Sequence, residues 1–582
     1  MNKKLPDETA AAHDSPDMPD SQLSRRSFMR GAMLYALAAG AGTTLSACGG
    51  GGGDDGAGSP APSPAPGTAT EAFRHGVASG DPLSDRVILW TRVTPGAPGN
   101  FDVAWELASD ANFGAIVGRG TLSTGPAQDY TVKVDAPGLQ PASVYYYRFS
   151  WGAERSTVGR TMTLPSGNVN QVKLAVLSCA NFPAGYFNVY ADVAKRGDID
   201  VALHLGDYIY EYGLLGYASQ LAFVIDRESD PRQEILTLAD YRLRHAQYKS
   251  DPDLRAMHAA VPLIAVWDDH DVADNAWSGG AANHDASSEG SFAARRAAAV
   301  QAWQEWLPIR VPDAASPLKI YRSFDFGSLA SLHMLDTRLI GRDEQLTLPQ
   351  YLDGVGLGPA RQLLGTEQSA WLTAQMTASR AVWQVLGQQV LMARMEIPLS
   401  VASSFTLQTL AEYTLAKATP EPLRNDAQRA LVNQRRAPYN LDAWDGYPAA
   451  RESVLAVARN LDKNLISLAG DTHNAWASDL TDAAGQHVGV EFATASISSP
   501  GFERTLPLIS SVVLQDAFPE MVPDLRYAEC SHRGYVVLTL TPGEARSEWV
   551  QVDTVLSRSY EARTVKTLRT LPGPGNRTVL GA

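Results

Sequence analysis

A recurring pattern in this chain is a short apolar run that ends in a cluster of polar side chains. The apolar runs are Leu174–Leu177, Val201–Leu205, Leu263–Trp267 and Leu465–Ala469. They lead, in order, into Ser178-Cys179, Gly206-Asp207-Tyr208-Ile209-Tyr210, Asp268-Asp269-His270-Asp271 and Gly470-Asp471-Thr472-His473, and a fifth cluster is Asp336-Thr337-Arg338. Short apolar runs are typical of buried strands, and polar groups at the carboxyl ends of core strands can converge on one crevice. Because a buried group of acids is stable only when cations balance it, the pattern predicts a metal-centred hydrolase.

Between residues 170 and 565, strand-like segments alternate with segments of helical spacing. The predicted helices are Asn188–Arg196, Leu238–Ala260, Ser291–Trp306 and Thr366–Ala381, and later strands are predicted at Gly489–Phe492, Tyr535–Leu540 and Trp549–Val552. This alternation indicates a layered α/β domain, which we expect to be catalytic. An insert at 396–444 is helical in parts and could cover the site, and residues 566–582 are expected to form a C-terminal tail.

The preceding region, residues 71–166, has the pattern of an all-β domain. Its predicted strands are short, alternating and rich in β-branched and aromatic residues: Val87–Val93, Val103–Leu107, Tyr130–Val134 and Val144–Phe149. Four or more strands in this length predict a small β-sandwich. The stretch Gly138–Pro141 before Val144–Arg148 resembles a fibronectin type III strand edge.

Residues 1–70 carry targeting signals and are not expected to belong to the fold. Ser24–Met29 is a twin-arginine signal, and Leu45-Ser46-Ala47-Cys48 resembles a lipobox that would place a lipid on Cys48. Residues 49–70 are rich in Gly, Ser and Pro, which is typical of a flexible linker. We therefore expect export by the twin-arginine translocation (Tat) machinery to a periplasmic or extracellular location, with lipid anchoring to a membrane. The alternative is a plain Tat signal cleaved near Ala47, in which Cys48 has no role.

Charge and cysteine content narrow the function further. The net charge of −14 argues against nucleic-acid-specific binding, which favours a basic face. Besides Cys48, the chain holds Cys179 and Cys530, which could pair as a disulfide. Cys179 lies inside the acidic cluster, where a thiolate would act as a ligand, so we expect Cys530 to be a buried small residue instead.

The residue types in the cluster indicate two kinds of metal. Asp207 is the natural bridging carboxylate, and Tyr210 can reach the same ion. A phenolate together with the Cys179 thiolate favours Fe(III) over zinc, and His473 can bind the same iron. Oxygen ligands such as Asp269 and Asp471 suit calcium or magnesium. His270 would then be available to donate a proton or to hold phosphate.

Taken in order, the motifs resemble those of one enzyme family. They are Phe73–Pro82, Gly159–Thr161 with Leu164-Pro165, Ser178-Cys179, Gly206-Asp207 with Tyr210, Trp267–Asp271, Leu335–Arg338, Trp444–Pro448 and Gly470–His473. This order and spacing are similar to the PhoD-type alkaline phosphatase and phosphodiesterase family, within the calcineurin-like metallophosphoesterases. Cys179-Ala180-Asn181 replaces the Asp-x-His of ordinary members, which fits the PhoD branch. The resemblance implies a four-layer αββα sandwich preceded by a fibronectin-III-like β-sandwich.

The resemblance also implies cofactors and site residues. It implies one Fe(III) held by Cys179, Asp207, Tyr210 and His473, and two calcium ions held by Asp207, Asp269 and Asp471, with Asn275 as a further calcium ligand. Asp269-His270 stands where ordinary members have Asn-His. The fourth-motif histidine of ordinary members has no counterpart that can be placed here, and Gln388 or Gln389 is the candidate for its position. Arg338 is either a phosphate contact or the partner of Asp336 or another acid.

The expected function is therefore an exported alkaline phosphatase with phosphodiesterase activity. Water activated by the metals would attack phosphorus in a phosphate monoester or diester. One alternative is a phospholipase D-like phosphodiesterase, and another is a catalytically inactive surface lipoprotein, although Asp207, Asp269 and His473 are all present. For the metals, the alternative is a zinc or manganese site, against which Cys179 and Tyr210 argue.

Overall fold

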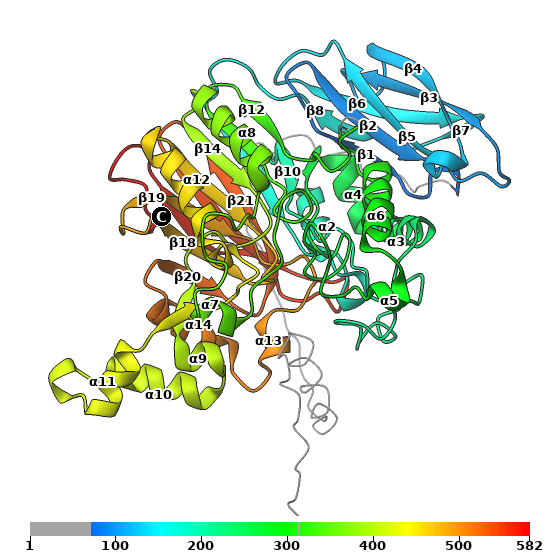
Figure 1. Ribbon diagram of the computed structural model, residues 1–582. Helices are drawn as coiled ribbons and strands as arrows, with labels where there is room; N and C mark the ends of the chain where they lie inside the picture. Colours follow the sequence, from blue (N-terminus) through cyan, green and yellow to red (C-terminus); the bar gives the residue numbers. More distant parts are fainter. Residues whose placement is uncertain (1–70, 311–314, 582) are drawn as a thin grey trace, which may run out of the picture. The chain divides into compact units, whose positions relative to one another are not determined.

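Two large β-sheets form the centre of the fold (Figure 1). The computed structural model describes residues 71–310 and 315–581, so the predicted export signal, Cys48 and the linker 49–70 lie outside the described residues. The first sheet has the order β24 (Leu580–Gly581), β23 (Ala562–Thr570), β22 (Ala545–Val552), β21 (Arg533–Leu540), β9 (Val172–Leu177), β10 (Val201–His204), β11 (Leu263–Ala265), β1 (Val77–Gly80), β2 (Arg86–Arg92) and β5 (Thr131–Pro137). The second has the order β12 (Arg322–Phe326), β13 (Ala330–Met334), β14 (Trp383–Gly387), β17 (Asn464–Ala469), β19 (His487–Ala493), β18 (Ala475–Thr481) and β20 (Leu525–Glu529).

Both faces of these sheets are covered, which explains why most residues of their central strands are apolar. In β9, Leu174 and Val176 enter a core shared by the two sheets, whereas Ala175 and Leu177 enter a core shared with helices. β17 divides its side chains in the same way. A strand buried on both faces reads as a continuous apolar run, because neither side faces water. The apolar runs that precede the polar clusters in the sequence are thus central strands of the two sheets: β9, β10 and β11 in the first and β17 in the second.

Helices pack on the outer face of each sheet and complete four layers (Figure 1). The first sheet is covered by α2 (Asn188–Lys195), α3 (Leu238–Ser250), α4 (Pro252–Ala260) and α6 (Phe292–Trp306). The second is covered by α8 (Gly365–Ala378), α12 (Pro448–Asn460) and α14 (Ser511–Met521). The predicted αββα architecture is confirmed. The predicted helix Leu238–Ala260 is divided at Asp251, whose side chain caps the N-terminus of α4 ahead of Pro252.

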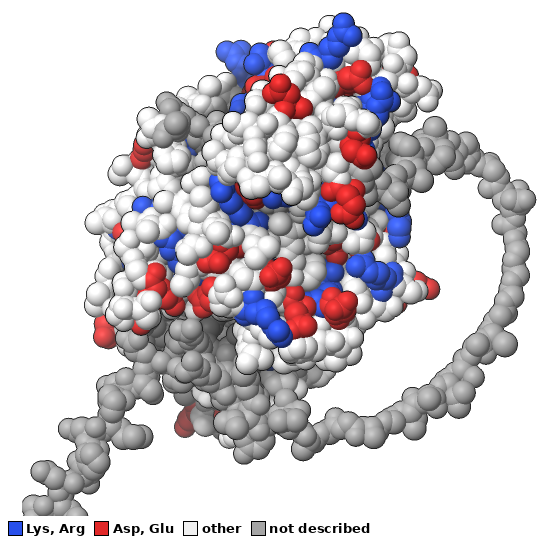
Figure 2. All heavy atoms as spheres, turned by 90° about the vertical axis from the view of Figure 1, so that its right-hand side faces the viewer, with Lys and Arg blue, Asp and Glu red and all other residues white. Residues whose placement is uncertain are grey.

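The N-terminal β-sandwich is also confirmed, but one of its sheets continues into the α/β domain. The separate sheet consists of β4 (Ile116–Thr124), β3 (Phe101–Ala108), β6 (Val144–Trp151) and β7 (Glu154–Arg155), with β8 (Gly159–Met162) paired to β6. It packs through an apolar core against β2 and β5, which belong to the first large sheet. The link is a parallel pairing of β1 with β11 at Gly80 and Leu263. On the face shown in Figure 2, acidic and basic side chains are interspersed rather than gathered by sign.

The insert and the C-terminal segment both take defined positions. The insert forms a two-stranded ribbon, β15 (Glu396–Pro398) with β16 (Arg436–Pro438), and three helices, α9 (Leu399–Ser403), α10 (Leu407–Ala418) and α11 (Asp426–Asn433). α10 and α11 extend away from the sheets (Figure 1). Residues 566–581 do not form a separate tail; they complete β23 and add β24 to the first sheet. No helix in the described part of the chain combines the length and apolar character that spanning a bilayer requires.

Candidate metal centre

The predicted ligands meet at the carboxyl ends of strands from both sheets. Cys179, Asp207 and Asp269 follow the neighbouring parallel strands β9, β10 and β11, and Asp471 and His473 follow β17 of the other sheet. Three overlapping groups result, within each of which the ligand atoms lie within 4.8 Å of one another. The groups are Cys179, Asp207 and His473; Asp207, Asp269 and His270; and Asp268, Asp269 and Asp471. Asp207 and Asp269 each belong to two groups, as bridging carboxylates would.

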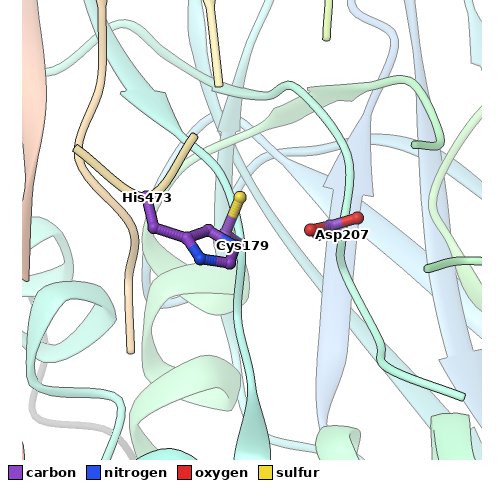
Figure 3. A group of neighbouring side chains, drawn as sticks. All are labelled: Cys179, Asp207 and His473. Atoms are coloured by element: carbon purple, nitrogen blue, oxygen red, sulfur yellow. The ribbon is translucent and has the colours of Figure 1, made fainter. Parts of the chain in front are cut away.

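The first group also includes the predicted tyrosine ligand. Figure 3 shows the Cys179 thiol and the His473 ring close to the carboxylate of Asp207. The Tyr210 hydroxyl donates to Asp207 Oδ2 at 2.8 Å and lies 3.1 Å from His473 Nε2. His473 Nδ1 lies 2.9 Å from the Pro500 carbonyl oxygen, so a proton on Nδ1 leaves the Nε2 lone pair facing Tyr210. All four residues expected to hold iron therefore converge.

The backbone is bent unusually at these ligands. Cys179, Asp207, Asn275, Asp471 and His473 all have a positive φ, between 54° and 63°. A non-glycine residue in this region costs on the order of 1–3 kcal/mol, and such residues gather at functional sites. Two glycines allow the tight approach of the motifs: a Cβ on Gly206 would lie 2.3 Å from Asp268 Cβ, and one on Gly470 would lie 2.2 Å from Ser178 Oγ. The strained backbone positions therefore coincide with the residues that are predicted to bind metal.

The cluster contains more acidic groups than its basic side chains balance. Burial raises the pKa of Asp207 and Asp268 well above the usual value, and it does the same for the Cys179 thiol and the Tyr210 hydroxyl. Asp207 Oδ1 and Asn275 Oδ1 are buried and have no hydrogen-bond partner among the described residues, and Asp269 Oδ1 lies 3.5 Å from Arg338 Nη2. Orphaned buried oxygens of this kind are costly unless a cation meets them. The donor set of oxygens, one thiol and one imidazole therefore fits metal ions.

Asn275 is placed by the loop that follows the third motif. Its backbone N–H donates to Asp269 Oδ2 at 2.6 Å, so the residue stands beside a predicted ligand, and its side-chain Oδ1 is buried. Gln388 and Gln389, in contrast, form hydrogen bonds that hold neighbouring strand ends in place. Gln389 donates to the carbonyls of Trp267 and Leu335 and so ties the ends of the two sheets together, and Gln388 bonds to Val390 and Ser467.

His270 is held by a carboxylate that the sequence pattern did not single out. Its Nδ1 lies 2.8 Å from Glu211 Oε2, and Glu211 Oε1 accepts from the Asp274 N–H and from Asn283 Nδ2. Although burial opposes it, the negative charge of Glu211 raises the pKa of His270 well above its ordinary value. The ring also stacks on Tyr210, with centroids 4.3 Å apart. The only signal in the sequence was an acid directly after Tyr210.

Arg338 is completely buried and surrounded by carboxylates. Its guanidinium donates to Asp268, to Asp471 at 3.0 Å, and to both oxygens of Asp442 at 2.9 and 2.7 Å. Asp336 instead accepts from the backbone N–H of Arg338. Asp442, at the end of the insert, also pairs with Arg342 and was not predicted from the sequence. The geometry favours the ion-pair alternative for Arg338, with acids other than Asp336.

Both cysteines of the described region are free. Cys179 and Cys530 are buried and unpaired, and Cys530 packs in the apolar core beneath the second sheet, as expected.

Comparisons with known proteins agree with this arrangement. The model of the PhoD-like phosphatase family matches residues 174–549, and that of the PhoD-like phosphatase N-terminal domain matches residues 59–165. The chain is 38% identical over 500 residues to alkaline phosphatase D of Bacillus subtilis (strain 168), covering 82% of this chain and 77% of that protein. A solved structure described as the structure of PhoD superposes with a TM-score of 0.73 at 34% identity, covering 89% of this chain and 93% of that one.

Proposed function

The chain belongs to the PhoD-like phosphatase family and is a phosphoric ester hydrolase, and from this premise we propose an exported alkaline phosphatase that cleaves both phosphate monoesters and diesters. The observation that carries the proposal is the set of three ligand groups that share Asp207 and Asp269. Shared carboxylates are what a site for several adjacent cations needs. An inactive surface lipoprotein would have no use for the strained backbone that assembles them.

We assign one Fe(III) to Cys179, Asp207, Tyr210 and His473, and two calcium ions to Asp207, Asp269, Asp471 and Asn275. A thiolate and a phenolate suit a trivalent iron, whereas carboxylate and amide oxygens suit calcium. When bound, the metals would polarise the phosphate ester and lower the pKa of the attacking water. The protein's own part is to hold the ligands in place before substrate arrives, through the bent backbone and the bonds of Tyr210 and His473.

His270 is assigned the role of proton donor or phosphate contact. Glu211 fixes its Nδ1, so Nε2 is the nitrogen turned to the reacting groups. A ring held by Nδ1 in this way suits donation from its other nitrogen to a phosphate oxygen or to the leaving group. Arg338 contributes positive charge beneath the acids, and its contact with phosphate stays an open prediction.

Export and anchoring complete the proposal and rest on residues 1–70. We propose transport by the Tat machinery and a lipid on Cys48, because the twin-arginine signal and the lipobox occur in the expected order. Folded export suits an enzyme whose metals are loaded beforehand.

Metal removal tests the cofactor assignment. Elemental analysis of the exported protein is expected to find one iron and about two calcium ions per chain, the ion sets that these donor types favour. A calcium chelator is expected to reduce hydrolysis of both a monoester and a diester by at least about 100-fold, and added calcium to restore it. Zinc or manganese in place of iron, with activity that the chelator leaves intact, would contradict the assignment.

Glu211→Gln tests the support of His270. The substitution keeps the size of the side chain but removes the charge that orients and stabilises the protonated ring, so kcat/KM is expected to fall about 10–100-fold. Metal content should not change, because Glu211 is in none of the ligand groups. Glu529→Gln is the matched control, since Glu529 pairs with His532 at 3.1 Å outside the site. Equal kcat/KM in the two variants would show that Glu211 does not support His270 in catalysis.

A further inference from the structure

The loop that follows β19 lies against the residues to which we assign iron. We call residues 497–500 the serine loop, because Ser498 and Ser499 are its two middle residues. The backbone N–H groups of both serines donate to the Cys179 carbonyl oxygen at 3.4 Å, and both side chains are buried. The last carbonyl oxygen of the loop lies 2.9 Å from His473 Nδ1. The serine loop therefore contacts two of the assigned iron ligands through its backbone.

The side chain of Ser499 contacts a third assigned ligand. Its hydroxyl donates to the Tyr210 hydroxyl oxygen at 2.6 Å. The same Tyr210 oxygen lies 2.8 Å from Asp207 Oδ2 and 3.1 Å from His473 Nε2. Ser499 therefore bonds to the phenol oxygen at the point where three of the assigned ligands meet.

The backbone of Ser499 is held in place on both sides of its side chain. Its N–H donates to the Cys179 carbonyl oxygen, and its own carbonyl oxygen accepts from the Ser496 hydroxyl. The Ser496 carbonyl oxygen in turn accepts from the N–H of Gly534 in β21, at 3.0 Å. The chain thus leaves the second sheet at β19 and is bonded to the end of β9 and to β21 of the first sheet. A hydroxyl on such a backbone has a fixed position before any ion binds.

Ser499 differs from the other two polar neighbours of the Tyr210 oxygen. Asp207 and His473 are predicted ligands, so metal binding would take the lone pairs that now face Tyr210. Ser499 is not a predicted ligand, and its hydroxyl can continue to donate to Tyr210. Once Tyr210 is a phenolate, this bond is charge-assisted and roughly twice as strong as a bond between neutral groups. Hydrogen bonds that orient a ligand in this way contribute about 10–100-fold to metal affinity.

We propose that Ser499 is a positioning residue whose hydroxyl holds the Tyr210 oxygen toward the ion that Cys179, Asp207, Tyr210 and His473 would bind. The proposal rests on the proposed function in one respect, since a transition metal must occupy this group of ligands. It does not depend on which transition metal that is, nor on the substrate.

The adjacent serine provides a matched control for Ser499→Ala. Ser498→Ala also removes a buried hydroxyl, but this hydroxyl donates to the Asn181 carbonyl oxygen at 2.8 Å and not to a ligand side chain. Both variants and the unaltered protein are exported with their metals and incubated with a chelator. The measurement is the half-time for loss of the transition metal, taken from elemental analysis of the protein at intervals.

Ser499→Ala is expected to lose the transition metal about 10–100-fold faster than Ser498→Ala, because only Ser499 orients a ligand side chain. Ser499→Thr keeps the hydroxyl and is expected to retain the metal as the unaltered protein does. Where the metal is iron, visible absorbance should shift in Ser499→Ala alone, since the phenolate oxygen loses a donor.

Equal half-times in the two alanine variants would overturn the proposal, as would loss from Ser499→Thr that is as fast as loss from Ser499→Ala. A protein that holds no transition metal would also overturn it. Zinc or manganese in place of iron would contradict only the iron assignment, and the half-times would still decide the role of Ser499.

Discussion

Asp207→Asn is expected to lower kcat/KM for a soluble monoester by at least about 1,000-fold. Asp207 supplies an oxygen to two of the three ligand groups, and the Tyr210 hydroxyl donates to it. An amide keeps the shape but removes the charge that the two proposed cations would share, so several kcal/mol of transition-state stabilisation would be lost. Elemental analysis should show that iron and calcium both decrease, which separates a bridging role from a role toward one ion.

Asp251→Asn is the matched control for this experiment. Asp251 is also buried, caps α4 and pairs with Arg227, but it belongs to none of the ligand groups. It is expected to lower thermal stability while leaving the metal content per folded chain unchanged. If Asp207→Asn retained both metals and lost activity no further than Asp251→Asn does, Asp207 would not be the bridge.

The strand-end motifs were readable from the sequence because burial on both faces leaves a plain signature. β9, β10, β11 and β17 are enclosed by sheet on one side and helices on the other, so their buried stretches are mostly apolar, interrupted only by His204 in β10 and Ser467 in β17. Packing in the core does not explain a cluster of polar side chains directly after such a run, so the cluster indicates a functional site. The convergence of the predicted ligands follows, since parallel neighbours end at the same edge of a sheet.

The surroundings of Arg338 could not be predicted from the sequence, because the strand before it contains buried polar side chains that form hydrogen bonds with their neighbours. β13 leads to Arg338, but it carries Ser331 and His333, which are buried through bonds to Asp325, Ser323 and Gln384, so it lacks an apolar signature. Asp442 reaches Arg338 from about 100 residues away, at the far end of the insert. Spacing along the chain holds no information about such a contact.

The joining of the sandwich to the first large sheet was hidden for a different reason. β1 pairs with β11 through backbone groups, at Gly80 and Leu263. Backbone hydrogen bonds are available to every residue type, so the pattern of side chains identifies each strand but not its neighbour.

Arg338→Met is expected to lower the free energy of unfolding by about 3–5 kcal/mol when calcium is absent. Arg338 is fully buried and is the cation that Asp268, Asp442 and Asp471 share. Removing one partner of a buried ion pair leaves uncompensated charge, which is the source of this cost. Chemical denaturation with and without calcium is the measurement. Calcium at the neighbouring carboxylates should recover part of the loss, because it restores positive charge to the same acids.

Arg342→Met separates this effect from the loss of any buried arginine. Arg342 is equally buried and pairs with Asp442, but it makes no ion pair with Asp268, Asp269 or Asp471. Its substitution should therefore be destabilising to an extent that calcium does not change. A phosphate-contact role for Arg338 predicts a different outcome: a raised KM with stability close to that of the unaltered protein. Because the carboxylates already occupy the guanidinium, we expect the stability loss, and with it an arginine that holds the acids together until the metals arrive.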